Sequence, residues 1–125
     1  MKEIEYLLLQ TSYGEHHWTP PKGHVDKGES DFETALRETR EESGYTAADL
    51  KINKEYTKVL KYKVKGNPKI VTYWLAELSS NKPVKLSSEH QAFKWAKLEE
   101  ACKLSAFPDM QQLLRDTSEY LKSKA

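Results

Sequence analysis

The sequence predicts an α/β domain in which strands and helices form packed layers. Runs rich in β-branched and aromatic residues alternate with stretches of helical periodicity. One helix carries both a start and a stop signal, and two more helical stretches close the chain. Because 125 residues suffice for one hydrophobic core, we expect a single domain over residues 1–125.

Four segments have the composition of strands, and the pattern between them indicates turns and loops. The Gly66-Asn67-Pro68 segment predicts a turn between the two central strands. Cys102, the only cysteine, falls at a position that looks buried in a helix, so we expect it in the core. The expected strands are 4–10, 52–64, 69–78 and 90–95, the loops are 11–22 and 79–87, and the closing helices are 97–104 and 108–121.

A helix is expected over 31–43. Ser30 and Glu33 have the spacing of a capping box, and Gly44 supplies a stop. At ~100° per residue the helix has two distinct faces. We expect the core face to consist of Phe32, Ala35, Leu36 and Thr39, and a second face to carry Glu38, Glu41 and Glu42.

The acidic face works against the stability of its own helix. Glu38 and Glu42 are a like-charge pair one turn apart, and the acids lie toward the negative end of the helix dipole. A solvated acidic face with Arg37 and Arg40 as partners is one interpretation. The alternative is a site at which a cation compensates the carboxylates.

The residues around this helix favour the cation site. Between positions 23 and 45 the chain reads Gly23, five residues, Glu29, seven residues, and then Arg-Glu-Thr-Arg-Glu-Glu-Ser-Gly. This segment resembles the Nudix box and matches each of its glycines, glutamates and its arginine. It departs from the pattern at two aliphatic places, which hold Thr39 and Tyr45, and this affects local packing rather than chemistry.

The resemblance implies a fold, an activity and a metal. The fold is a Nudix α/β/α sandwich with a mixed central sheet, and the chain starts without the first strand usual in that family. The activity is hydrolysis of a nucleoside diphosphate linked to another group, with Mg²⁺ or Mn²⁺ as cofactor. The implied metal ligands are Glu38, Glu41, Glu42 and the carbonyl of Gly23, while Glu29 and Arg37 form a supporting ion pair.

Segments outside the Nudix box resemble one particular group of proteins within the family. Residues 16–25, 69–76 and 88–95 closely resemble the asymmetrical diadenosine tetraphosphate hydrolases of animals, which yield ATP and AMP. The likeness implies that Glu89 faces the metal cluster as a ligand or general base. As an exposed loop acid, Glu89 would have no special role.

The same resemblance implies a set of substrate contacts. Lys22, His17 and His24 surround the metal loop and could hold phosphate oxygens, although loop histidines often only bind backbone groups. The positions that clamp adenine are Tyr62 and Phe107, with core packing and a helix-start contact as the alternatives. Lys69 could reach the remote phosphates, whereas Trp74 and Trp95 are assigned to the core.

Two other functions remain open. The chain could hydrolyse another diphosphate, such as capped RNA or a diphosphoinositol phosphate, or it could bind nucleotide without catalysis. The 20 basic and 19 acidic residues give a net charge of +1, which argues against binding duplex nucleic acid. With neither a signal peptide nor a membrane-spanning stretch in the pattern, we expect a cytoplasmic monomer, with the nucleus as a second compartment.

Overall fold

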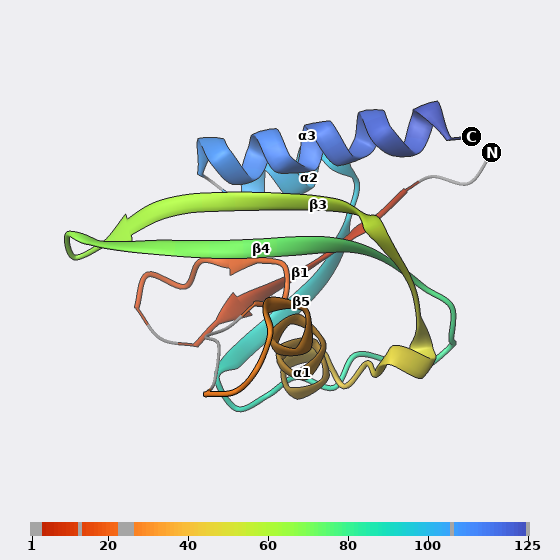
Figure 1. The fold of residues 1–125 in the computed structure, drawn as a ribbon, viewed down its shortest axis with the longest axis horizontal. Helices are drawn as coiled ribbons and strands as arrows, with labels where there is room; N and C mark the ends of the chain where they lie inside the picture. The colour runs from red at the N-terminus through yellow and green to blue at the C-terminus, as the bar shows by residue number, and fades with distance from the viewer. Residues whose placement is uncertain (1–3, 13, 23–26, 106, 125) are drawn as a thin grey trace. The chain divides into compact units, whose positions relative to one another are not determined.

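The computed structural model describes residues 4–12, 14–22, 27–105 and 107–124. Its contacts divide the chain into two compact units, residues 1–20 with 88–125 and residues 21–87 (Figure 1). In chain order the elements are β1 (Tyr6–Thr11), β2 (Trp18–Thr19), α1 (Asp31–Ser43), the 3-10 turn η1 (Ala47–Asp49), β3 (Leu50–Val64), β4 (Asn67–Leu78), β5 (His90–Ala96), α2 (Leu98–Ser105) and α3 (Pro108–Ser123).

The first unit joins an antiparallel sheet to the two C-terminal helices. Its strand order is β2-β1-β5, and α2 contacts all three strands and packs on α3. Cys102 is buried here, as expected. The apolar core of the unit consists of Leu8, Leu9, Ala96, Ala101, Cys102, Met110, Leu113 and Leu114. We expected residues 18 and 19 in a loop, but they form β2, which is too short for any alternation in the sequence to reveal it.

The second unit is built on the long hairpin of β3 and β4. Its register runs from Leu50 opposite Leu78 to Val64 opposite Asn67. The turn is the pair Lys65 and Gly66, with φ of 51° and 81°. Two residues of positive φ make a two-residue hairpin turn, so the expected three-residue turn at 66–68 is one residue too late, and positions 67 and 68 belong to β4.

Helix α1 has the bounds that the sequence predicted. The Ser30 hydroxyl accepts a hydrogen bond from the backbone N–H of Glu33 at 3.1 Å, and the Glu33 carboxylate accepts one from the N–H of Ser30 at 2.9 Å. At the other end Gly44 has φ of 84° and donates its N–H to the carbonyl of Arg40. Local capping chemistry therefore sets both ends of this helix.

The expected core face of α1 is only half-buried. Phe32 packs edge-on against Trp74 of β4, with ring centroids 5.1 Å apart. The fully buried residues of α1 are Thr34 and Ser43, whereas Trp74 and Trp95 are half-buried rather than core. The hairpin that α1 contacts has only two strands, and so narrow a sheet covers part of a helix face.

The sheet topology differs from the expected single mixed sheet. Among the described residues every strand pair is antiparallel, and the strands form two sheets. A parallel pair needs a crossover between strands of one sheet, but the strands that precede and follow α1 lie in different sheets. The α/β class is confirmed, while the expected absence of a first strand concerns residues ahead of β1, of which 1–3 lie outside the described residues.

No helix in the described part of the chain combines the length and apolarity needed to span a bilayer.

Candidate functional site

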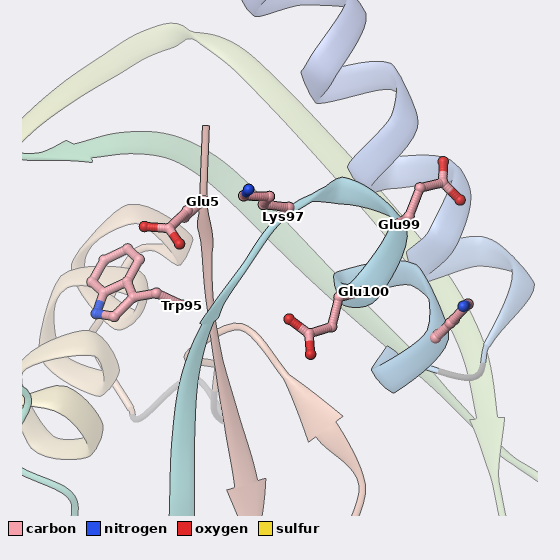
Figure 2. Close-up of a pocket in the computed structure, with 6 residues that line it drawn as sticks. Glu5, Trp95, Lys97, Glu99 and Glu100 are labelled. Atoms are coloured by element: carbon pink, nitrogen blue, oxygen red, sulfur yellow. The ribbon is translucent and has the colours of Figure 1, made fainter. Parts of the chain in front are cut away.

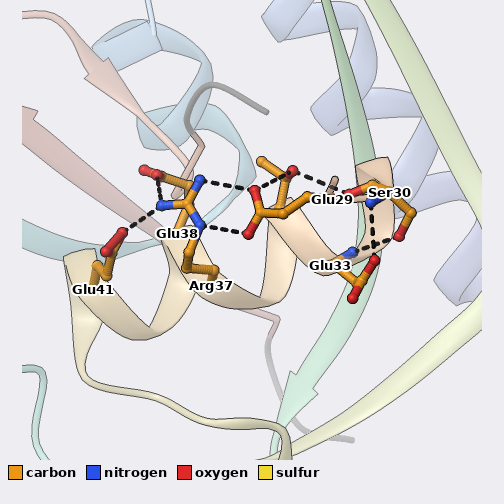
Figure 3. Close-up of polar contacts among 7 residues, drawn as sticks. Glu29, Ser30, Glu33, Arg37, Glu38 and Glu41 are labelled. Atoms are coloured by element: carbon orange, nitrogen blue, oxygen red, sulfur yellow. Dashed lines mark hydrogen bonds and ion pairs between the residues drawn. The ribbon is translucent and has the colours of Figure 1, made fainter. Parts of the chain in front are cut away.

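Arg37 of α1 lies at the centre of a group of carboxylates from α1 and from the loop ahead of it (Figure 3). Its guanidinium donates to both oxygens of Glu29, from Nε at 2.7 Å and from Nη2 at 3.1 Å. Nη1 donates to Oε1 of Glu38 at 2.5 Å and to Oε1 of Glu41 at 2.6 Å. The structure thus contains the expected pair of Glu29 and Arg37, and it adds two carboxylates of the acidic face to the same guanidinium.

Neighbouring groups fix this arrangement. The Thr34 hydroxyl donates to Glu29 at 3.0 Å, so Glu29 is held from two sides. The side chains of Arg37, Glu29 and Glu38 are only 20%, 19% and 16% exposed. The hydrogen bonds that Arg37 donates to Glu29, and after them those to Glu38 and Glu41, raise the pKa of Arg37. One guanidinium therefore meets three carboxylates, and the group keeps an excess of negative charge.

Glu42 occupies a different environment one turn further along the helix. Its Oε1 accepts a hydrogen bond from the backbone N–H of Lys22 at 3.0 Å. Burial raises the pKa of Glu42 to about 8, the charge of Glu38 adds to this effect, and the Lys22 N–H opposes it. The environment of Glu42 therefore disfavours its charged form, and a bound cation would favour it.

The chemistry of these residues fits a hard divalent cation. Carboxylate oxygens are the ligands that Mg²⁺ prefers, and both the excess charge around Arg37 and the raised pKa of Glu42 would be relieved by a positive ion. Within the described ranges, however, no three acids, histidines or cysteines already stand in a metal-binding arrangement. Glu38 and Glu41 bind Arg37 instead, and Gly23 lies outside the described residues.

The hairpin of the same unit carries two of the expected substrate residues. Tyr62 and Lys69 face each other across β3 and β4, so both side chains project from one face of the hairpin. Tyr62 is 37% exposed, which contradicts the alternative of a core position. Burial raises the pKa of Tyr73, and the neighbouring Tyr62 and Glu42 add to this effect. Tyr73 was not among the expected site residues, although its spacing of four from Lys69 along a strand places it on the same face.

The other unit carries the remaining described candidates. The ring of His17 meets that of Phe107 edge-on, with centroids 4.8 Å apart. Phe107 is 45% exposed and stands at the N-cap of α3, where its carbonyl accepts from the N–H of Gln111. Glu89 is exposed, and its backbone carbonyl accepts from Ser12 at 2.9 Å. The structure thus pairs His17 with Phe107, which the sequence did not predict, while His24 lies outside the described residues.

A hollow in the first unit contains none of the expected site residues (Figure 2). Its volume is about 600 Å³, and Figure 2 shows Glu5 and Trp95 beside one another at one side of it. Lysines and glutamates line the rest of the hollow. Because their charges have opposite signs, the hollow favours neither an anion nor a cation. The lining residues are Glu5, Trp95, Lys97, Glu99, Glu100 and Lys103.

Comparison with known proteins identifies the class of this fold and site. The family model described as the NUDIX domain matches residues 2–117, and the chain belongs to this family. Nudix hydrolases generally use a divalent metal. The resemblance of residues 23–45 to the Nudix box is thereby confirmed.

Individual relatives are more specific. The chain is 54% identical to the bis(5'-nucleosyl)-tetraphosphatase [asymmetrical] of Mus musculus, over 96% of this chain and 82% of the mouse protein. It is 50% identical to the protein of the same name from Caenorhabditis elegans, over 95% and 86% of the two chains. Among solved structures, a C. elegans Ap4A hydrolase binary complex matches with a TM-score of 0.95 and 50% identity, covering 97% of this chain and 88% of that one.

Proposed function

We propose that this chain is a metal-dependent hydrolase that splits diadenosine tetraphosphate asymmetrically into ATP and AMP. The observation that carries the proposal is the 54% identity to an asymmetrical tetraphosphatase over nearly the whole chain, together with an intact set of box glutamates. We further propose that residues 1–125 act as one Nudix domain, since the family match spans both compact units.

The proposed metal ligands are carboxylates of α1 with two groups from elsewhere in the chain. Glu38, Glu41 and Glu42 would hold Mg²⁺ or Mn²⁺ together with Glu89 and the carbonyl of Gly23. A bound divalent cation would neutralise phosphate charge and lower the pKa of the attacking water. Two protein features support the assignment: the raised pKa of Glu42, and the surplus of carboxylates over the single guanidinium of Arg37.

The pair of Glu29 and Arg37 is proposed as structural support. Its two parallel hydrogen bonds fix the loop residue Glu29 on the helix, and Thr34 secures the same carboxylate. Arg37 also orients Glu38 and Glu41, so it sets where two proposed ligands stand before any cation arrives. It is therefore a positioning residue rather than a catalytic one.

Substrate contacts are proposed for six residues. His17, Lys22 and His24 would contact the phosphates near the metal, and Lys69 those further away. Tyr62 and Phe107 would stack on adenine, and both are exposed enough to offer a ring face. The proton of the attacking water would pass to Glu42 or to Glu89, since each carboxylate is a proposed neighbour of the reaction centre.

The experiment that tests the function is a product analysis. The purified chain is incubated with diadenosine tetraphosphate and Mg²⁺, and the nucleotides are separated by chromatography. We expect equal amounts of ATP and AMP, no reaction in EDTA, and a rate loss of orders of magnitude in Glu42→Gln. Glu119→Gln, which alters an exposed acid of α3, is the matched control and should keep full activity.

Two outcomes would contradict the proposal. Two molecules of ADP per substrate would mean symmetrical cleavage and a different placement of the attacking water. Full turnover in EDTA would remove the metal from the mechanism. Replacing Mg²⁺ by Mn²⁺ in the same assay tests which ion the site prefers.

A second substrate class follows from a relative that matches a shorter stretch of the chain, 42% of the relative's own length. An RNA pyrophosphohydrolase of Vibrio atlanticus is 35% identical over 65% of this chain. The same assay with 5'-triphosphorylated and capped RNA distinguishes the two classes, and we expect slower turnover of both than of the dinucleoside tetraphosphate.

For the cell we propose a monomer in the cytoplasm, with some protein in the nucleus, which sedimentation and fractionation would test.

A further inference from the structure

The outer half of the β3–β4 hairpin carries an excess of positive charge. Residues 56–76 contain five lysines and no acid, in a chain whose net charge is only +1. The bounding acids are Glu55 and Glu77. A local field of one sign on a projecting hairpin attracts ligands of the opposite sign and repels copies of itself.

The register separates the hairpin into two faces. Tyr62 and Lys69 are opposite partners, so they share the face to which we assign substrate contacts. Val59 opposite Thr72, and Lys61 opposite Ile70, lie on the other face. The residues Val59, Lys61, Lys63, Pro68 and Ile70, which we call the outer hairpin face, therefore stand apart from the proposed substrate face.

Helix α1 covers only the base of this second face. Trp74 and Thr57 continue it toward the body of the unit, where the Trp74 ring packs against Phe32. Beyond that contact, the exposed fraction of the side chains rises to 50% at Val59 and 67% at Ile70. Exposed aliphatic side chains of this size, one on each strand and diagonal to one another, form an apolar stripe.

The stripe is flanked by cations and held rigidly. Lys61 and Lys63 are exposed and have no ion-pair partner in the described part of the chain. Eight successive residue pairs, from Thr57 with Trp74 to Val64 with Asn67, join the strands without a break. A surface that is ordered before binding loses little conformational entropy when a partner docks.

We propose that the outer hairpin face binds an acidic, aliphatic-rich peptide segment of another protein. Leucine, isoleucine or valine side chains of the segment would cover Val59 and Ile70, and its carboxylates would pair with Lys61 and Lys63. This inference does not depend on the proposed hydrolase activity, because none of the five residues belongs to the proposed metal or substrate set.

Two other occupants fit less well. A second copy of the chain would bring two lysine-rich faces together, at an electrostatic cost. Single-stranded nucleic acid would match the charge, but it needs exposed aromatic rings for its bases. Trp74, on the same side of the hairpin, lies outside the outer hairpin face, is half-buried and packs on Phe32, so the outer hairpin face offers aliphatic side chains rather than aromatic rings.

The test is a selection of random peptides displayed on phage against the whole chain, followed by measurement of Kd for the enriched peptides by fluorescence anisotropy. We expect enriched sequences in which aspartate or glutamate alternates with leucine, isoleucine or valine. Ile70→Ser and the double variant Lys61→Ser, Lys63→Ser should each raise Kd about tenfold or more. Phe93→Ser and Lys122→Ser, which remove an exposed aromatic and an exposed lysine elsewhere, are matched controls that should leave Kd unchanged.

Several results would overturn the proposal. These are an absence of enrichment over an unrelated protein, enriched peptides without acids, and unchanged Kd in the Ile70 and lysine variants. Tighter binding of short oligodeoxythymidine, lost in the same variants, would assign the face to nucleic acid instead. Circular dichroism and hydrolysis rates of each variant, which we expect to match the parent chain, show that the fold is intact.

Discussion

Replacing Glu42 by glutamine should make the metal-free protein more stable while it abolishes hydrolysis. The carboxyl of Glu42 is desolvated on α1, stands near the charge of Glu38, and receives one compensating hydrogen bond, from the Lys22 N–H. Glutamine keeps an oxygen that can accept this bond and carries no charge. The substitution therefore removes a penalty on the folded state that a bound cation would otherwise relieve.

The size of the effect follows from the pKa of Glu42. Burial raises it from an ordinary 4.5 to about 8. Between these values the folded chain holds a proton that the unfolded chain has lost, so stability falls as pH rises from 4.5 to 8. The difference between these two pKa values corresponds to a loss of roughly 5 kcal/mol in the free energy of unfolding if solvent does not reduce it. Because the carboxyl keeps some contact with water, we expect about 2–3 kcal/mol.

Urea unfolding in EDTA at pH 5 and pH 8 measures this difference. We expect Glu42→Gln to exceed the parent chain in stability at pH 8 by about 2–3 kcal/mol, and by much less at pH 5. Added Mg²⁺ should stabilise the parent chain more than the variant. Lower stability of Glu42→Gln at pH 8, or a difference independent of pH, would refute the reasoning, and Glu119→Gln should show neither effect.

Three further predictions concern other parts of the second unit. Tyr62→Ala should raise KM for the dinucleotide about tenfold with little change in kcat, because one base stack is lost, and unchanged kinetics would remove Tyr62 from the site. Gly44→Ala should lower the free energy of unfolding by about 1–2 kcal/mol, because alanine is strained at a φ of 84°. The added Cβ would also stand 3.1 Å from the Cβ of Lys85, and thermal melting measures the combined loss. A hydrogen bond from the N–H of Thr46, and then Lys82, lower the pKa of Asp49, so Asp49→Asn should destabilise the chain at neutral pH. The difference in stability between the variant and the parent chain should close as pH falls below 3.8, which urea titrations across pH would show.

Much of the local structure could be predicted from the sequence. Helix α1 begins and ends where Ser30, Glu33 and Gly44 indicated, because a cap acts through groups only a few residues apart. The acids of the candidate site could be predicted for a similar reason, since one helix carries Glu38, Glu41 and Glu42 at a spacing that the chain itself sets. The family assignment rested on the same short segment and is confirmed.

Other features depended on contacts between distant segments. The sequence did not show that Arg37 would bind Glu38 and Glu41 as well as Glu29, because the rotamer of a long side chain depends on every acid within its reach. Nor did it show the pairing of His17 with Phe107, which lie ninety positions apart. The two-residue strand β2 exists only because β1 offers it a partner.

The sequence by itself determined the family, the acidic helix and the order of most elements, because each of these depends on residues that lie close together in the sequence. Tertiary structure decided the division into two sheets, the half-buried position of Trp74 and the raised pKa of Glu42. Pairing and desolvation are properties of segments that meet only after folding, and a linear pattern does not contain them.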